Sequence, residues 1–235
     1  MIETWVLTCE HGGNRVPAAH RARFATRRAR MALHSHRGFD PGALEVARAL
    51  GRSLEVPVIY STVTRLLVDL NRSVGHPELF SEFTSGLAFH ERERILARYY
   101  RPHRQRVEEA VEAHVERGRT VLHVAVHSFT PQLRGEVRNA DVGLLYDPRR
   151  ELEKRFCLHW KKAFDALPFG LRIRRNYPYQ GRDDGLTTHL RRRFSGTTYL
   201  GVELEMNQAF VAGRAEDRRM MVRAVIQSLN VALGS

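Results

Sequence analysis

The sequence is poor in cysteine and in lysine, and it has no long apolar run. Its two cysteines, Cys9 and Cys157, lie far apart and give no disulfide framework, which suits a reducing compartment. No apolar run approaches the length required to cross a bilayer, and the N-terminus lacks the basic and apolar regions of a signal peptide. We therefore expect a cytoplasmic protein with no membrane partner.

The positive charge comes almost entirely from arginine. The formal net charge is +12, and Lys154, Lys161 and Lys162 are the only lysines among the 38 basic residues. The arginines are spread along the whole chain, many of them beside glutamates on expected helix surfaces. The sequence shows no zinc finger, recognition helix or aromatic–basic RNA signature. We therefore do not expect a nucleic acid as a partner.

Apolar runs alternate with amphipathic segments along the chain. The proportions of apolar (43%) and charged (27%) residues are those of a soluble globular protein. Strands followed by helices predict one α/β domain over residues 1–235 with a mainly parallel sheet. The expected strands cover residues 4–9, 58–61, 142–146 and 199–205, with a further strand in the stretch 121–131 that cannot continue past Pro131. The expected helices cover residues 43–54, 91–116 (interrupted near Pro102), 151–167, 187–194 and 215–233.

Two of the expected strands lead into a histidine. The apolar run Val121–Val126 continues into His127 and Ser128 before Pro131 ends the strand. His11 follows the strand 4–9 in the same way. In open α/β sheets, ligands bind at the carboxyl ends of the strands. One such histidine is typically a hydrogen-bonded core residue, whereas two strands with the same ending favour a shared site.

A carboxylate is available to complete a metal site. Asp40 precedes the helix 43–54, and two imidazoles with one carboxylate form the ligand set of a catalytic zinc, which leaves a position open for water. Two alternatives stay open. Asp40 could instead be the helix N-cap, with Pro41 at the first helical position. Glu10 is a rival carboxylate ligand, although neighbours in a strand point to opposite faces, so Glu10 and His11 should aim at different points.

The last strand carries Glu203 and Glu205, which lie two residues apart and therefore share a face. A carboxylate beside a metal-activated water is the usual general base in hydrolysis. The alternative interpretation is a strand end paired with arginines. The turn-rich loop of residues 176–185, which contains Tyr179, is expected to form a pocket wall.

Six segments of the chain resemble the N-formylglutamate amidohydrolase family. They are residues 9–17, 40–43, 68–73, 126–131, 141–147 and 202–207. The family belongs with the zinc carboxypeptidase-like hydrolases, so the resemblance implies a three-layer α/β/α sandwich around a mainly parallel mixed sheet. It also implies that His11, Asp40 and His127 bind Zn²⁺ and that Glu205 is the general base.

The run Asp69-Leu70-Asn71-Arg72 is similar to the substrate-carboxylate motif of aspartoacylase-like deacylases. The similarity implies that Asn71 and Arg72 bind an acidic amino acid, since a guanidinium forms paired bonds to a carboxylate. The predicted function is zinc-dependent removal of an N-acyl group, such as formyl, from a small acidic amino acid such as glutamate. Arg65 is the candidate for stabilising the oxyanion. Further candidate substrate-binding residues are Asp69, Asn14, Ser128 and Tyr179.

Three other functions stay in consideration. A zinc peptidase or a cell-wall amide hydrolase would use the same scaffold, and a metal-binding protein would keep the site without turnover. A metal-free hydrolase with Cys9 as nucleophile is disfavoured, because a cysteine within a buried strand is usually inert and no Gly-x-Ser-x-Gly motif is present. The sequence does not indicate an oligomeric state.

Overall fold

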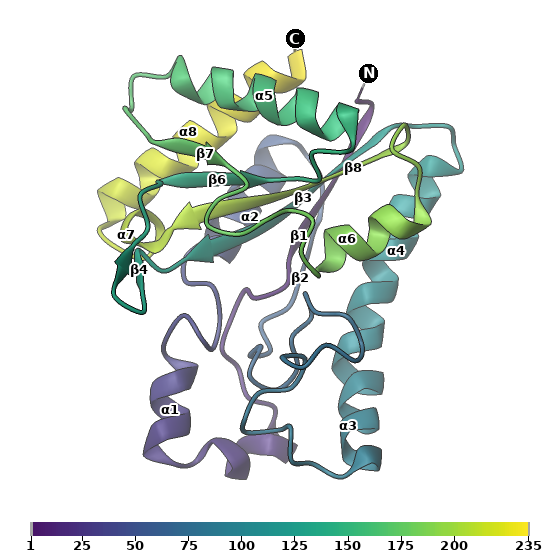
Figure 1. The fold of residues 1–235 in the computed structure, drawn as a ribbon, viewed down its shortest axis with the longest axis vertical. Helices are drawn as coiled ribbons and strands as arrows, with labels where there is room; N and C mark the ends of the chain where they lie inside the picture. The colour runs from purple at the N-terminus through teal and green to yellow at the C-terminus, as the bar shows by residue number, and fades with distance from the viewer. Residues whose placement is uncertain (1, 235) are drawn as a thin grey trace.

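A computed structural model describes residues 2–234, which form a six-stranded mixed sheet between two layers of helices (Figure 1). The strand order is β2-β1-β3-β8-β6-β7. The first four are parallel, β6 runs antiparallel to β8, and β7 is parallel to β6. The strands are β1 (Thr4–Cys9), β2 (Val58–Tyr60), β3 (Val121–Phe129), β6 (Val142–Leu145), β7 (Ile173–Arg175) and β8 (Tyr199–Asn207). The predicted three-layer sandwich with a mainly parallel mixed sheet is confirmed.

Helices α2 (Ala43–Ser53), α5 (Glu151–Asp165) and α8 (Ala215–Gly234) cover one face of the sheet. Their core includes Val124 and Val202 of the central strands and the fully buried Trp160 of α5. Burying such side chains stabilises the fold by about 1.5–3 kcal/mol each. No helix within residues 2–234 is long and apolar enough to span a membrane.

Helices α4 (Arg101–Val115) and α6 (Leu186–Arg193) cover the opposite face, where Val107 and Leu190 pack against Tyr199. Side chains alternate along a strand, so His127 and Glu205 project on the same side as Tyr199. Both strands are buried along nearly their whole length, so these polar groups lie within the protein.

The predicted interruption of the long helix near Pro102 is confirmed. Helix α3 (Phe89–Ile95) passes into a π-helical turn, Leu96–Tyr100, before α4 begins. Proline lacks an N–H and its ring displaces the carbonyl of the preceding turn, so the regular hydrogen-bond ladder cannot continue. The π-helical turn sets the start of α4. From this helix, His103 Nε2 lies 3.5 Å from Glu10 Oε1.

A separate cluster lies beyond the carboxyl ends of the parallel strands, in the lower part of Figure 1. It contains the 3₁₀ segment Ala18–Phe24, helix α1 (Arg27–Leu33) and the loops that follow β2. The arginines between residues 21 and 30 are exposed. The apolar Phe24, Ala29 and Leu33 pack inward and close this end of the molecule.

Candidate active site and metal centre

The carboxyl ends of β1 and β3 bring two histidines and an aspartate together. The backbone N–H of Asp40 donates to the carbonyl of His11 at 2.9 Å, which places this loop beside the end of β1. Asp40 Oδ2 lies 2.8 Å from His127 Nδ1 and 3.4 Å from His11 Nδ1. One ligand atom from each residue fits within 4.8 Å of the others, and all three residues are buried. The predicted convergence of these residues is therefore present.

The capping alternative for Asp40 is wrong. Helix α2 begins at Ala43, and Gly42 is its N-cap with a φ of 81°. This left-handed conformation favours glycine, and a Cβ there would lie only 2.4 Å from the carbonyl oxygen of Val211. Gly42 thus starts the helix, and the Asp40 carboxylate is left to face the histidines.

Each imidazole is backed by a second carboxylate. Asp69 Oδ1 lies 2.8 Å from His11 Nε2, and Glu10 Oε2 lies 3.2 Å from His127 Nε2. Carboxylates in these positions orient metal-binding histidines and fix which ring nitrogen carries the proton. Glu10 approaches the ring nitrogen of His127 that Asp40 does not contact. The geometry therefore fits an outer position for Glu10 better than a ligand position.

The electrostatics of the cluster favour a cation. Burial opposes protonation of His127, but hydrogen bonding and charge from Asp40 and Glu10 outweigh it and raise its pKa well above the ordinary value. Burial also opposes ionisation of Asp40, yet His11 and His127 lower the pKa of that carboxyl. Buried carboxylates outnumber Arg65, the one arginine in the cluster, so the remaining balancing charge comes from protonated histidines or from a divalent ion that replaces their protons.

Glu205 lies directly beside His127, because the parallel register of β3 and β8 pairs these two residues. Its Oε2 atom is buried and has no hydrogen-bond partner among the residues described. Burial raises the pKa of Glu205 to about 7, with contributions from the nearby Asp40 and Glu203. Glu203 projects on the same face, but its Oε1 already accepts a hydrogen bond from Thr187 at 2.8 Å. Of the two glutamates, Glu205 is the buried one with the raised pKa, and neither of its oxygens accepts a hydrogen bond from the residues described.

These groups line a cavity of about 130 Å³. The sequence predicted the loop 176–185 as a wall, although it singled out only Tyr179 and not the loop's other lining residues. Asp69 and Glu10 lie behind the histidines instead of in the lining. The cavity is lined by His11, Asp40, Arg65, Asn71, Arg72, His127, Ser128, Tyr179, Gln180, Asp183, Asp184, Glu203 and Glu205.

Asn14 does not reach this cavity. Its amide donates to the carbonyl of Leu33 at 3.0 Å and thereby holds the end of α1. Gly12 and Gly13 do not line the cavity either, and they pack closely against the backbone of residues 61–62. Ser128 does line the cavity, with its hydroxyl donating to the Pro41 carbonyl at 2.8 Å. The strand–loop junction at residues 11–14 is therefore shaped by packing against neighbouring chain segments.

Asn71 and Arg72 join two loops at the rim of the cavity. Asn71 Oδ1 accepts a hydrogen bond from the Leu186 N–H at 2.7 Å. Arg72 Nη1 donates to the carbonyl of Asp184 at 2.8 Å, and Ser73 binds the Asp184 carboxylate through its N–H and hydroxyl. The Asn71 amide NH₂ has no partner within residues 2–234, so it is a free donor in the cavity lining.

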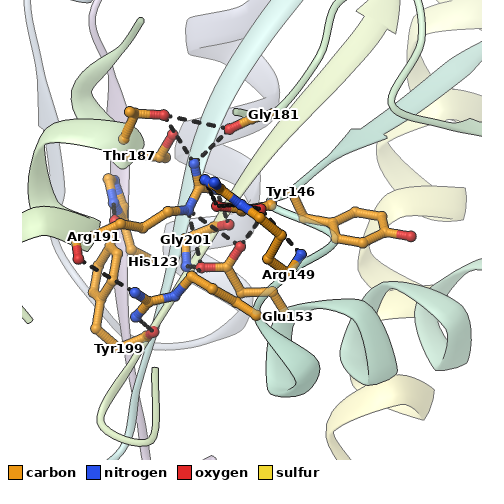
Figure 2. Close-up of polar contacts among 12 residues, drawn as sticks. His123, Tyr146, Arg149, Glu153, Gly181, Thr187, Arg191, Tyr199 and Gly201 are labelled. Carbon is orange, nitrogen blue, oxygen red and sulfur yellow. Dashed lines mark hydrogen bonds and ion pairs between the residues drawn. The ribbon is translucent and has the colours of Figure 1, made fainter. Parts of the chain in front are cut away.

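A buried ion-pair cluster contacts the cavity-wall loop of residues 176–185 through Gly181 (Figure 2). Arg191 Nε lies 3.0 Å from Glu153 Oε1, and its other nitrogens donate to the carbonyls of Gly181 in the wall loop and Gly201 in β8. Arg150 also contacts Glu153, at 3.2 Å. Glu153 is fully buried. Arg191 therefore connects helix α5, the sheet and the wall loop.

Replacement of Arg191 by methionine should destabilise the protein by about 3–5 kcal/mol, because the buried Glu153 would lose its principal partner. Arg192→Met is the matched control, since Arg192 is exposed on the same helix and should change the stability by less than about 0.5 kcal/mol. Urea unfolding of both variants measures the difference. Equal stabilities would contradict a supporting role for the Arg191–Glu153 pair.

Solved structures of other proteins share this fold. A solved structure of a gene product from Agrobacterium tumefaciens has a TM-score of 0.84 and 26% identity, covering 98% of this chain and 90% of that one. An N-formylglutamate amidohydrolase from Ralstonia eutropha JMP134 has a TM-score of 0.67 and 19% identity, covering 98% and 93%, which shows a shared fold. No curated protein sequence matches the chain.

The sequence model of one family, N-formylglutamate amidohydrolase, matches residues 3–212, which is most of the chain. The match spans every segment that contributes to the cavity, from His11 to Glu205. The resemblance drawn from the six sequence segments is thus confirmed. The chain belongs to the N-formylglutamate amidohydrolase family, whose members are hydrolases of amide bonds.

Proposed function

We propose that this protein is a zinc-dependent amidohydrolase that removes the N-acyl group from a small acidic amino acid such as N-formylglutamate. The observation that carries the proposal is the position of Glu205, whose unpartnered carboxylate oxygen lies beside the His11–Asp40–His127 cluster. Unlike Glu10, whose buried carboxylate lies behind His127, Glu205 presents its unpartnered oxygen in the lining of the cavity. A general base needs this arrangement.

The donor set fits zinc. His11 and His127 each offer Nδ1 toward Asp40, and a carboxylate faces Nε2 of each ring. Neutral imidazole nitrogens and one carboxylate oxygen are ligands that zinc prefers in catalytic sites. When bound, zinc would supply Lewis-acid activation for hydrolysis.

The proton transfers are assigned to Glu205. Its Oε2 would accept a proton from the attacking water and deliver it to the leaving amine nitrogen as the amide C–N bond breaks. A pKa raised by burial suits a group that must both take up and release a proton. Arg65 would stabilise the developing oxyanion, since Asp69 and Asp40 hold its guanidinium at the edge of the cavity.

The substrate carboxylate would bind at the part of the cavity wall formed by Asn71 and Arg72. The free amide of Asn71 and the guanidinium of Arg72 both line the cavity there. An amide donor and a guanidinium in one wall suit a carboxylate. Ser128 and Tyr179 would complete the binding surface.

Arg72→Lys should raise KM by about tenfold with little change in kcat, because lysine keeps the charge and loses the planar fork. Steady-state kinetics with an N-acyl glutamate measures the effect. The matched control is the same substrate with its α-carboxylate amidated, for which wild type and variant should differ far less. If KM rises equally for both substrates, the role of Arg72 is only to hold the loop that contains Asp184.

A substrate screen tests the proposed function as a whole. Purified protein supplied with zinc would be assayed on N-formyl, N-acetyl and N-succinyl amino acids, with short peptides and cell-wall muropeptides as competitors. Turnover of an acyl amino acid with about one zinc per chain supports the proposal. Turnover confined to peptides or muropeptides would favour a peptidase or a cell-wall amide hydrolase. Zinc binding without any turnover would favour a non-catalytic metal-binding protein.

A further inference from the structure

One buried arginine beside the cavity has no role in the reaction outlined above. Arg138 directly follows the small hairpin formed by β4 (Gln132–Leu133) and β5 (Glu136–Val137). It is 9% exposed, and no carboxylate within residues 2–234 forms an ion pair with it. Its guanidinium lies between two rings, 5.8 Å from the centroid of Phe129 and 4.9 Å from that of Tyr179. Stacking on aromatic faces compensates a buried cation, so the rings hold this charge in place.

The guanidinium also determines how the Tyr179 hydroxyl can be used. Arg138 Nη1 lies 3.0 Å from the Tyr179 hydroxyl oxygen. A guanidinium can only donate hydrogen bonds, so the phenol oxygen must be the acceptor. The proton of the phenol is then free for another acceptor, and no residue of the described chain accepts it. Tyr179 is 42% exposed and lines the cavity, so this proton is open to solvent or to an acceptor oxygen on a ligand bound there.

The stack is built onto the catalytic strand. Phe129 lies two residues after His127 in β3, so the two side chains project on the same face. Next to Arg138, the N–H of Asn139 donates to the hydroxyl of Tyr177 at 3.0 Å. Residues 138 and 139 therefore hold two tyrosines of the wall loop, and only Tyr179 of these two lines the cavity.

We propose that Arg138 is a positioning residue, which fixes Tyr179 so that its hydroxyl donates a hydrogen bond to a carbonyl or carboxylate oxygen of the substrate. The inference rests on the proposed function for its kinetic consequences, since it concerns the same cavity. It assigns to Tyr179 the task of orienting the substrate and to Arg138 the task of orienting Tyr179.

A double-mutant cycle tests the dependence of one residue on the other. Tyr179→Phe removes the hydroxyl and should lower kcat/KM by about tenfold, the value of one directed hydrogen bond. Arg138→Met should give a similar loss. The double variant should be no worse than Tyr179→Phe alone, because Arg138 acts only through that hydroxyl. A double variant whose loss is the product of the two single losses would overturn the proposal.

Two further variants separate positioning from a loosened loop. Arg138→Lys keeps a donor for the hydroxyl and should recover part of the activity lost in Arg138→Met. Tyr177→Phe removes the neighbouring hydrogen bond from the same segment and should leave kcat/KM unchanged. A loss in Tyr177→Phe equal to that in Arg138→Met, with no recovery by lysine, would show that the segment only anchors the loop.

A measurement that needs no turnover keeps this proposal distinct from the proposed function. Burial and Glu205 raise the pKa of the Tyr179 phenol, whereas the positive charge of Arg138 lowers it. Carbon-13 NMR of ζ-labelled tyrosine, with Tyr179→Phe to identify the resonance, should show a pKa about one unit higher in Arg138→Met. If the pKa shifts but the protein hydrolyses none of the substrates, the Arg138–Tyr179 contact is supported and the proposed function is rejected. An unchanged pKa in an active enzyme would reject the contact.

Discussion

His127→Ala is expected to lose bound zinc and hydrolytic activity together. His127 Nδ1 lies 2.8 Å from Asp40 Oδ2 at the centre of the cluster, so its removal leaves only His11 and Asp40 as ligands from this set. Loss of an outer partner typically weakens metal binding by about 10–100-fold, and loss of a ligand should exceed this range. Zinc content after dialysis and kcat/KM on the same samples measure both effects.

His123→Ala is the matched control for this prediction. His123 lies four residues earlier on the same strand and is also buried, but it bonds to Thr8 and Tyr199 and not to the cluster. The control should keep its zinc although it is less stable. Full zinc occupancy in His127→Ala would contradict the ligand assignment.

The same zinc measurement distinguishes Asp40 from Glu10 as the carboxylate ligand. Asp40→Asn should weaken zinc binding more than Glu10→Gln, because Asp40 faces both Nδ1 atoms whereas Glu10 faces only the far nitrogen of His127. The reverse order would make Glu10 the ligand.

The sequence was most informative where chain geometry leaves few alternatives. Parallel strands carry their carboxyl ends to one edge, so His11 after β1 and His127 near the end of β3 come close once those strands pair. Alternation along β8 likewise put Glu203 and Glu205 on one face. Long amphipathic helices such as α2 and α5 were predicted within two residues of their observed ends, since their periodicity extends over several turns.

Other features depend on contacts that no local pattern encodes. The sequence could not separate a capping Asp40 from a ligand Asp40, because the difference lies in the backbone of Gly42 and its contact with Val211. The bond from Arg72 to Asp184 joins residues more than a hundred positions apart. The strand β7 and the hairpin before Arg138 are too short to show a period.

Asn14 illustrates the limit of reasoning from a motif. It lies in a segment that resembles the family, and this alone suggested a substrate contact. Its amide is instead used at the end of α1, a helix that sequence periodicity did not predict. Once that helix is known, the carbonyl of Leu33 is an acceptor that an N–H donor has to satisfy.

Glu205→Gln should retain the fold and the zinc while lowering kcat by on the order of 10²–10⁴. Glutamine has nearly the same shape, but its amide cannot take a proton from water. The Oε2 atom of Glu205 is buried without a partner, so the substitution breaks no hydrogen bond that holds the fold. Zinc stoichiometry, thermal unfolding and kcat are measured on one preparation. Together they distinguish the loss of the general base from a loss of zinc or of stability.

Glu203→Gln is the matched control, two residues away on the same face of β8. Glu203 already accepts the Thr187 hydroxyl, and a glutamine oxygen can accept that bond too, so the rate should fall by less than about tenfold. If instead Glu203→Gln loses the larger part of the rate, the base is Glu203. If both variants keep nearly full activity, proton transfer does not occur at this strand.

The pH dependence adds a second criterion for the same assignment. Only the carboxylate form of Glu205 accepts a proton, so the wild-type rate should fall as the pH drops through the pKa of this group. Burial raises that pKa to about 7, and a divalent cation bound beside it would lower the value. The residual rate of Glu205→Gln should lack this acidic limb, whereas Glu203→Gln should keep it. An acidic limb that persists unchanged in Glu205→Gln would belong to another group, and Glu205 would then not be the base.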